Sequence, residues 1–128
     1  MGSQYDLFTK IFLDTDNEKT SVVEEVSKIV NGTVKGSAIV TEQAEIFLFN
    51  NGDFSEKKRN QGSDEFLYYR YYLDVEPIED VDGKDYIGEI STLLTELWDS
   101  GFKVIASCDF EDELPRKGGY NSEERLRL

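Results

Sequence analysis

The chain has 128 residues, a length that fits one domain with a single hydrophobic core. Its 27 acidic and 14 basic residues and its lack of histidine give a net charge of −13. This charge disfavours nucleic acid and anionic membranes as partners and favours a basic protein, and the alternative is that it serves solubility alone. Without histidine the chain has no Ser-His-Asp or Cys-His site and no imidazole ligand for zinc.

The only cysteine, Cys108, permits no disulfide within the chain and no thiolate metal cage. Such cysteine use fits a reducing compartment. No apolar run reaches the roughly 20 residues that cross a bilayer, and no basic segment followed by an apolar one marks a secretory leader. We therefore expect a cytoplasmic protein with a single domain over residues 1–128.

The first predicted elements are a strand over residues 5–13 and a helix over residues 17–30. Neither face of the strand is wholly polar, which favours a central strand over an edge strand. Ser21 and Glu24 have the spacing of a capping box near the start of the helix, and the alternative is an earlier cap at Asp16 or Asn17. The apolar residues of the helix recur at helical spacing: Val22, Val26, Ile29 and Val30.

Two further strands are predicted over residues 33–40 and 44–49. The short join between them favours an antiparallel hairpin, and Gly36 indicates a bulge or a close backbone approach. Residues 50–65 then form a polar loop, with Lys57, Lys58 and Arg59 together at its tip. A loop this long inside a compact domain usually has a function or is disordered.

Residues 66–76 are rich in Tyr, Phe, Leu and Val and are predicted to form the longest strand, which Pro77 ends. Its odd-numbered residues are all apolar or aromatic and are expected to face the helices. Its even-numbered residues mix aromatic rings with charge and are expected to lie on the other face: Phe66, Tyr68, Arg70, Tyr72, Asp74 and Glu76.

A second helix is predicted over residues 83–100, because an apolar stripe with a period of 3.6 runs from Tyr86 to Trp98. A last strand follows over residues 102–110, with Val104, Ala106, Cys108 and Phe110 on one face. The chain turns polar from Glu111, and a C-terminal tail starts at about residue 115, with residues 123–128 a short helix or a loose end.

The predicted order is strand, helix, three strands, helix, strand. This order predicts an α+β two-layer sandwich, in which a mostly antiparallel sheet of about five strands carries both helices on one face. It is a variant of the ferredoxin-like pattern with one extra strand in the middle. The other face of the sheet is left open.

That open face is the first candidate binding site, since a contiguous exposed aromatic patch is typical of an interaction surface. The alternative is that the 50–65 loop or the C-terminal tail covers it. The predicted partner-binding residues on this face are Phe8, Phe12, Phe66, Tyr68, Arg70 and Tyr72.

An acidic segment after the last strand is the second candidate. Its carboxylates could pair with Lys and Arg of a partner. The alternative is a solvated charged loop without a binding role. The residues concerned are Asp109, Glu111, Asp112 and Glu113.

Metal binding, catalysis and RNA binding find little support in the sequence. The carboxylates of Asp14, Asp16, Glu18 and Glu25 have EF-hand spacing, but Lys19 stands where that loop needs glycine, so no metal site and no cofactor are expected. Cys108 lies at an apolar strand position, which is typical of a core residue rather than a nucleophile. The aromatic spacing of RNA-recognition domains is absent and the charge has the opposite sign.

In size, acidity and α+β layout the whole chain resembles the small acidic immunity proteins that bacteria encode beside polymorphic or contact-dependent toxins. The segment from Ile105 to Pro115 carries this resemblance most clearly. The resemblance implies a protein without catalysis that binds its cognate toxin, often a basic nuclease, and blocks its active site or substrate-binding surface.

We therefore predict a non-catalytic acidic domain that binds a basic protein, with an immunity protein that neutralises a toxin as the first choice. The alternative is a ferredoxin-like regulatory or ligand-binding module that acts as a homo-oligomer. A third reading is a small enzyme that uses carboxylates.

Overall fold

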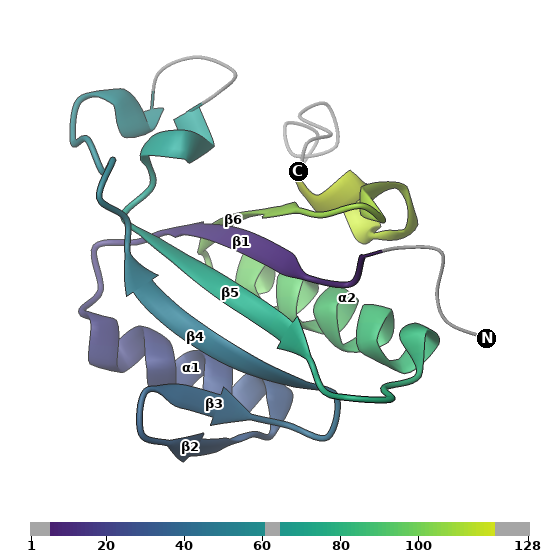
Figure 1. The fold of residues 1–128 in the computed structure, drawn as a ribbon. Coiled ribbons are helices and arrows are strands. Elements are labelled where there is room, and N and C mark those ends of the chain that lie inside the picture. The colour runs from purple at the N-terminus through teal and green to yellow at the C-terminus, as the bar shows by residue number, and fades with distance from the viewer. Residues whose placement is uncertain (1–5, 61–64, 120–128) are drawn as a thin grey trace.

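The structure, a computed structural model, describes residues 6–60 and 65–119 (Figure 1). Within these residues the chain forms two helices, α1 (Lys19–Val30) and α2 (Gly83–Asp99). It also forms six strands: β1 (Thr9–Asp14), β2 (Thr33–Lys35), β3 (Ala38–Val40), β4 (Ala44–Asn50), β5 (Tyr71–Pro77) and β6 (Lys103–Ser107).

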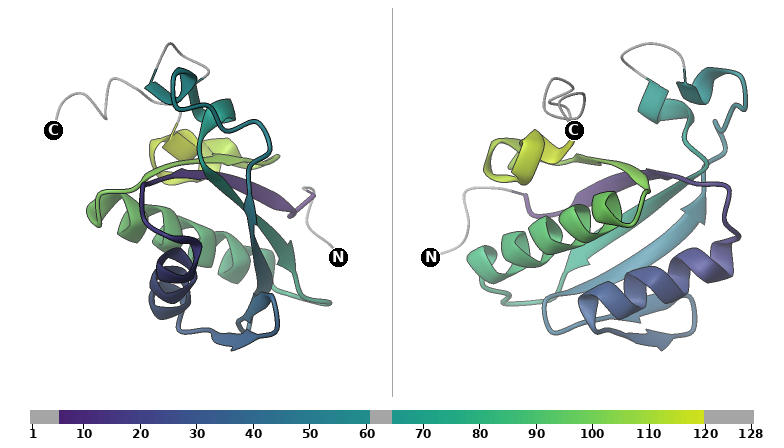
Figure 2. Two further views of the ribbon diagram at one scale, coloured as in Figure 1. Left: turned by 90° about the vertical axis from the view of Figure 1, so that its left-hand side faces the viewer. Right: turned by 180° about the vertical axis from the view of Figure 1, so that it is seen from behind.

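The six strands form one antiparallel sheet in the order β2-β3-β4-β5-β1-β6. Both helices pack on the same face of this sheet, and the other face has no helix over it (Figures 1 and 2). The predicted α+β class is confirmed. The predicted count of about five strands is wrong, because the described residues form six.

The extra strand arises at Gly36, where the predicted strand 33–40 turns back on itself. Lys35 pairs with Ala38, so only Gly36 and Ser37 connect β2 to β3. Gly36 has a φ of 62°, which suits the first position of a two-residue hairpin turn. The prediction of a bulge is therefore corrected to a tight turn.

The long predicted strand 66–76 begins later than expected, at Tyr71. Residues Glu65–Tyr68 form a short 3₁₀ helix, η2. The pairing of β5 with its two neighbouring strands begins at Tyr71, opposite Leu13 of β1 and Asn50 of β4. Before Tyr71 other groups bind the backbone: Asp14 Oδ1 accepts from the Arg70 N–H at 3.0 Å, and the Asn51 amide donates to the Leu67 and Tyr69 carbonyls at 3.0 and 2.7 Å. The Asn51 N–H also donates to the Arg70 carbonyl at 2.9 Å.

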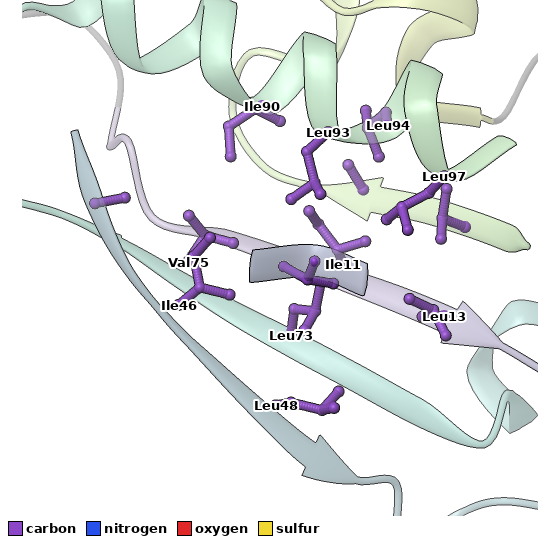
Figure 3. Packing of buried hydrophobic residues seen from close by; sticks show 14 of the residues in the cluster. Ile11, Leu13, Ile46, Leu48, Leu73, Val75, Ile90, Leu93, Leu94 and Leu97 are labelled. Atoms are coloured by element: carbon purple, nitrogen blue, oxygen red, sulfur yellow. The ribbon is translucent and has the colours of Figure 1, made fainter. Parts of the chain in front are cut away.

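The alternation predicted for this strand is confirmed from Tyr69 onwards. Tyr69, Tyr71, Leu73 and Val75 are all buried, whereas Leu67 lies in η2 and is 42 % exposed. The core lies between the sheet and the helices, where strand residues such as Ile11, Leu13, Ile46 and Leu73 meet Ile90, Leu93, Leu94 and Leu97 of α2 (Figure 3). Burying each such aliphatic side chain contributes about 1.5–3 kcal/mol.

The two helices agree with the predicted ranges to within two residues. At the start of α2, Asp82 Oδ1 accepts hydrogen bonds from the Lys84 and Asp85 N–H groups. At the start of α1 the cap is Glu18, whose side chain makes no capping bond. The capping box predicted at Ser21 and Glu24 is therefore wrong, because Ser21 lies inside the helix. Neither helix is long and apolar enough to cross a membrane, among the residues that the structure describes.

The part of the predicted tail that the structure describes, Pro115–Gly119, is packed rather than loose. It forms a compact turn segment, η4, in which Arg116, Lys117 and Gly118 have left-handed backbone conformations, and it packs against β6 and α2. Trp98 Nε1 donates to the Val104 carbonyl at 3.1 Å, and the Arg116 guanidinium lies 4.8 Å from the Trp98 ring centroid. The predicted helix or loose end at 123–128 lies outside the described residues.

Arg59, which was predicted to lie at the tip of the 50–65 loop, binds this loop to the end of β1. Arg59 is only 6 % exposed. Its Nε and Nη2 atoms bind the two Asp14 oxygens, each at 2.8 Å, and its Nη1 binds Asp16 and Glu56 at 3.0 Å. Hydrogen bonds to Asp14 raise the pKa of Arg59 further above its usual range. Residues 61–64 of the loop lie outside the described residues.

Candidate protein-binding face

The face of the sheet away from the helices carries a row of apolar side chains that crosses four strands. The pairing register places Phe49 of β4 opposite Tyr72 of β5, Tyr72 opposite Phe12 of β1, and Phe12 opposite Ile105 of β6. Side chains directly opposite one another on neighbouring strands are within contact distance. We call these four residues the aromatic row.

Ring contacts tie the aromatic row together. Phe49 and Tyr72 are stacked with centroids 5.2 Å apart, and Phe66 of η2 meets the Phe12 ring edge-on at 5.3 Å. Phe12 is thereby reduced to 8 % exposure, while Phe49 remains 39 % exposed. The accessible part of the row is therefore the pair Phe49–Tyr72.

A second row lies beside the first and mixes aromatic and charged groups. Phe47 is opposite Asp74, and Asp74 is opposite Lys10. The Lys10 ammonium lies 4.2 Å from the Tyr72 ring centroid and 5.1 Å from that of Phe12. Burial raises the pKa of Asp74, and the nearby positive charge of Lys10 partly offsets this.

A third row, beyond the second, contains two carboxylates. Glu45 of β4 is directly opposite Glu76 of β5, and both side chains are exposed. Within residues 6–60 and 65–119 neither of them takes part in an ion pair. Aromatic surface and unpaired negative charge therefore lie side by side on β4 and β5.

Three of the residues predicted to bind a partner meet on this face. Phe12 and Tyr72 belong to the aromatic row, and Phe66 packs on Phe12. Tyr68 and Arg70 come just before β5, at the end of the sheet where the aromatic row lies. The Lys58 ammonium is 5.1 Å from the Tyr68 ring centroid, and Arg70 Nη1 donates to the Asp16 carbonyl at 3.4 Å. Arg70 also lines a polar cleft of about 480 Å³ with Asn50, Asn51, Phe54 and Glu56.

The structure places Phe8 and the acidic segment at the opposite end of the sheet. Phe8 precedes β1 and is 40 % exposed. Phe8 and Phe12 are four residues apart, which in a strand corresponds to about 13 Å. Asp109 Oδ2 accepts from the Asp6 N–H at 3.2 Å, and Glu111 Oε2 accepts from the Cys108 N–H at 3.1 Å. Two of the four acidic side chains thus fasten local backbone, while Asp112 and Glu113 are exposed.

Sequence reasoning missed the contribution of β4. Phe47, Phe49 and Glu45 were not among the predicted site residues. The signal was present, because Ala44, Ile46 and Leu48 alternate with them and mark the buried face by a period of two.

The predicted alternative was a loop or tail folded over this face. The described parts of the 50–65 loop lie beyond the ends of β4 and β5 (Figure 1). Phe66 of η2 reaches back to the Phe12 ring. Segment η4 packs on β6 and α2 instead. These described parts leave Phe49 accessible.

The groups considered for metal binding and catalysis have other contacts. Asp14 and Asp16 of the proposed EF-hand spacing bind Arg59. Among the described residues no three His, Cys, Asp or Glu side chains are arranged to hold a metal ion. Cys108 packs partly buried against the core, and burial raises the pKa of its thiol to about 11. That thiol is therefore protonated at neutral pH.

A second hollow lies on the helix side, between α1 and the β2–β3 hairpin. It has a volume of about 430 Å³ and aliphatic walls, with Val23, Val34, Ile39 and Leu48 among them. Val34 is 52 % exposed. Two helices do not cover the full width of a six-stranded sheet, and the hairpin extends beyond them. The hollow can accept an apolar group, and Lys19, Glu24 and Ser37 also line it.

We compared the chain with models of known protein families, with curated proteins and with solved structures, and none of them matches it.

Proposed function

We propose that this chain is a non-catalytic acidic domain that binds a basic protein, and that it acts as an immunity protein that neutralises a toxin. The observation that supports this proposal is the aromatic row, with the Phe49–Tyr72 stack accessible on a sheet face that no helix covers. Aromatic side chains held rigidly on a sheet are typical anchors of protein interfaces.

The charge of the chain supports a basic partner. A net charge of −13 attracts a cationic protein over distance and speeds its encounter. Asp74 lies in the row next to the aromatic row, and Glu45 and Glu76 lie one row further along the same face, so the attraction extends to the contact surface itself. A nuclease toxin would present a basic surface of this kind, because it must bind phosphates. The single cysteine fits the cytoplasm as the site of action.

We also infer that the fold is a ferredoxin-like variant. Without β2 and β3, the remaining order is strand, helix, two strands, helix, strand, which is the split β-α-β pattern. The β2–β3 hairpin is then an addition at the edge next to β4.

The test begins with capture of the partner. The tagged chain is expressed in its native host, co-purified proteins are identified by mass spectrometry, and the basic domain among them is expressed alone and together with this chain. We expect that domain to stop growth alone and to permit growth with this chain. Capture of no basic protein, or growth arrest that co-expression leaves unchanged, would count against the proposal.

Paired variants then connect the binding to the sheet face. Loss of an aromatic anchor typically costs 2 kcal/mol or more, so Phe49→Ser should weaken the captured complex by about thirtyfold. Val34→Ser is the matched control, since Val34 is also an exposed apolar strand residue but lies on the helix side. Equal losses in the two variants, measured by calorimetry, would remove the aromatic row from the interface.

A further inference from the structure

We propose that the partner contributes an arginine whose guanidinium lies between Glu45 and Glu76, at the end of the open sheet face beside Phe47. This inference rests on the proposed function, because it names the chemical group by which a basic partner is held on the same face. It also moves the charged part of the contact from the predicted acidic segment to β4 and β5.

The first argument is the register. Glu45 and Glu76 are directly opposite each other on neighbouring strands. Like charges in this arrangement destabilise a sheet. Asp74, two residues before Glu76 on the same face of β5, adds a third carboxylate, and burial already raises its pKa. Three carboxylates therefore lie on one small part of the face in the free protein, and repulsion among them lowers the stability of the fold.

The second argument is that the described residues bring no cation to this pair. Lys10 of the same face is opposite Asp74, but its ammonium lies over the Tyr72 and Phe12 rings. Glu45 and Glu76 make no ion pair within residues 6–60 and 65–119. A cation from outside would satisfy both carboxylates at once.

The third argument concerns the kind of cation. Phe47 lies on the same face of β4, two residues after Glu45, and its other neighbour across the sheet is the small Ala38. The Phe47 ring is half-buried and lies next to carboxylates. This arrangement suits a planar cation, which can stack on the ring and donate several hydrogen bonds to the carboxylates. Guanidinium has this geometry and ammonium does not, so the site favours arginine over lysine.

The experiment uses two peptides of equal charge, hexa-arginine and hexalysine, titrated into the full chain at low salt and followed by calorimetry. We expect hexa-arginine to bind at least fivefold more tightly than hexalysine. Glu45→Gln and Glu76→Gln should each weaken hexa-arginine binding at least fivefold. Each should also raise the melting temperature of the free protein by about 1–3 °C, because the carboxylate repulsion is relieved.

Two control variants make the same change of charge elsewhere. Glu96 is exposed on α2, in the helix layer, and Glu113 is exposed in the acidic segment. Glu96→Gln and Glu113→Gln should change hexa-arginine binding less than twofold. Equal weakening by all four variants, equal affinity for the two peptides, or a fall in melting temperature in Glu76→Gln would each overturn the inference. Absence of hexa-arginine binding would overturn it too, while the proposed function would still be decided by partner capture and growth.

Discussion

The buried contact between Arg59 and Asp14 is the residue-scale feature on which the 50–65 loop depends. Both side chains are about 6 % exposed, and Asp14 also accepts the Arg70 N–H at 3.0 Å. One carboxylate thus binds both Arg59, within the loop, and the Arg70 backbone, between the loop and β5. Removal of one partner from such a pair leaves the other buried without its counter-charge, which costs far more than the pair itself gains.

Asp14→Ala is therefore expected to lower the free energy of unfolding by about 3–5 kcal/mol. The cost includes the Arg59 guanidinium and the Arg70 N–H, both of which lose their acceptor. Urea unfolding followed by circular dichroism measures this change. A loss below about 1 kcal/mol would show that the pair does not hold the loop.

Asp16 and Glu56 provide the controls for that variant. They bind the same guanidinium at 3.0 Å, but their side chains are 86 % and 77 % exposed. Exposed ion pairs of this kind contribute about 0–1 kcal/mol. Asp16→Ala and Glu56→Ala should therefore each cost less than about 1 kcal/mol in the same unfolding experiment.

The thiol of Cys108 provides a prediction about pH. Burial raises its pKa to about 11, whereas a free cysteine has a pKa near 8.5. Only the thiolate reacts, so alkylation by iodoacetamide at pH 8 should be about a hundredfold slower in the folded chain than in urea. The folded rate should still rise at pH 10, where the rate in urea has levelled off. A folded rate that levels off near pH 8.5 would contradict the raised pKa.

The same shift has a defined sign for stability. Between pH 8.5 and pH 11 the unfolded chain has lost the Cys108 proton while the folded chain keeps it. The contribution of this group to stability is therefore present below pH 8.5 and declines as the pH rises through this range.

At the scale of elements, the two edges of the sheet differ. Segment η4 packs against β6, and its Gly118 and Gly119 have φ values of 78° and 106°. A Cβ on Gly119 would lie 2.7 Å from the Val104 carbonyl oxygen, so the segment can approach β6 only with glycine at this position. At the other edge, β2 has only three residues, which limits the pairing that it offers to another chain.

Gly119→Ala is expected to destabilise the fold by about 2 kcal/mol, from backbone strain and the clash with Val104. It should also increase aggregation, because displaced η4 leaves the β6 edge open. Thermal unfolding with light scattering measures both effects. Gly52→Ala is the control, since a Cβ on Gly52 meets nothing within 4 Å and should change stability by less than about 0.5 kcal/mol. Equal behaviour of the two variants would show that η4 does not protect the edge.

Local periodicity was sufficient to predict most elements. The apolar stripe of α2 and the alternation from Tyr69 to Val75 both arise because one face of each element is buried against a neighbouring layer. Such burial produces a periodic pattern that can be recognised within a short stretch of sequence. The break at Gly36 could not be separated from a bulge, because both use a glycine with a positive φ. The late start of β5 depends on where β1 and β4 end, which is information from other parts of the chain.

The candidate site was predictable only in part for the same reason. Phe12 and Tyr72 were assigned to one face by parity, and their pairing follows from the antiparallel neighbours that the order of elements favours. The sequence groups Arg59 with Lys57 and Lys58 as a basic run in a loop. In the structure Arg59 binds Asp14, which lies 45 residues away along the chain. No local pattern distinguishes a lysine or arginine in solvent from one that is bound by a distant carboxylate.

At the scale of the whole molecule, the excess of acidic residues has opposite effects on folding and on binding. A net charge of −13 on 128 residues repels itself in the compact state. The same charge attracts a basic partner from a distance. Salt screens exposed charges beyond about 10 Å at 0.1 M, so it should weaken both effects together.

We therefore expect added NaCl to raise the melting temperature of the free chain and to slow its association with the captured basic partner. Charges outside the contact act mainly on the association rate, whereas charges inside it act mainly on dissociation. The double variant Asp112→Asn, Glu113→Gln should thus slow association at low salt and leave dissociation unchanged, because both side chains are exposed and lie away from the aromatic row. Glu45→Gln and Glu76→Gln should instead speed dissociation at every salt concentration. Stopped-flow measurements between 20 mM and 300 mM NaCl separate the two classes, and an association rate that does not change with salt would contradict an interaction led by charge.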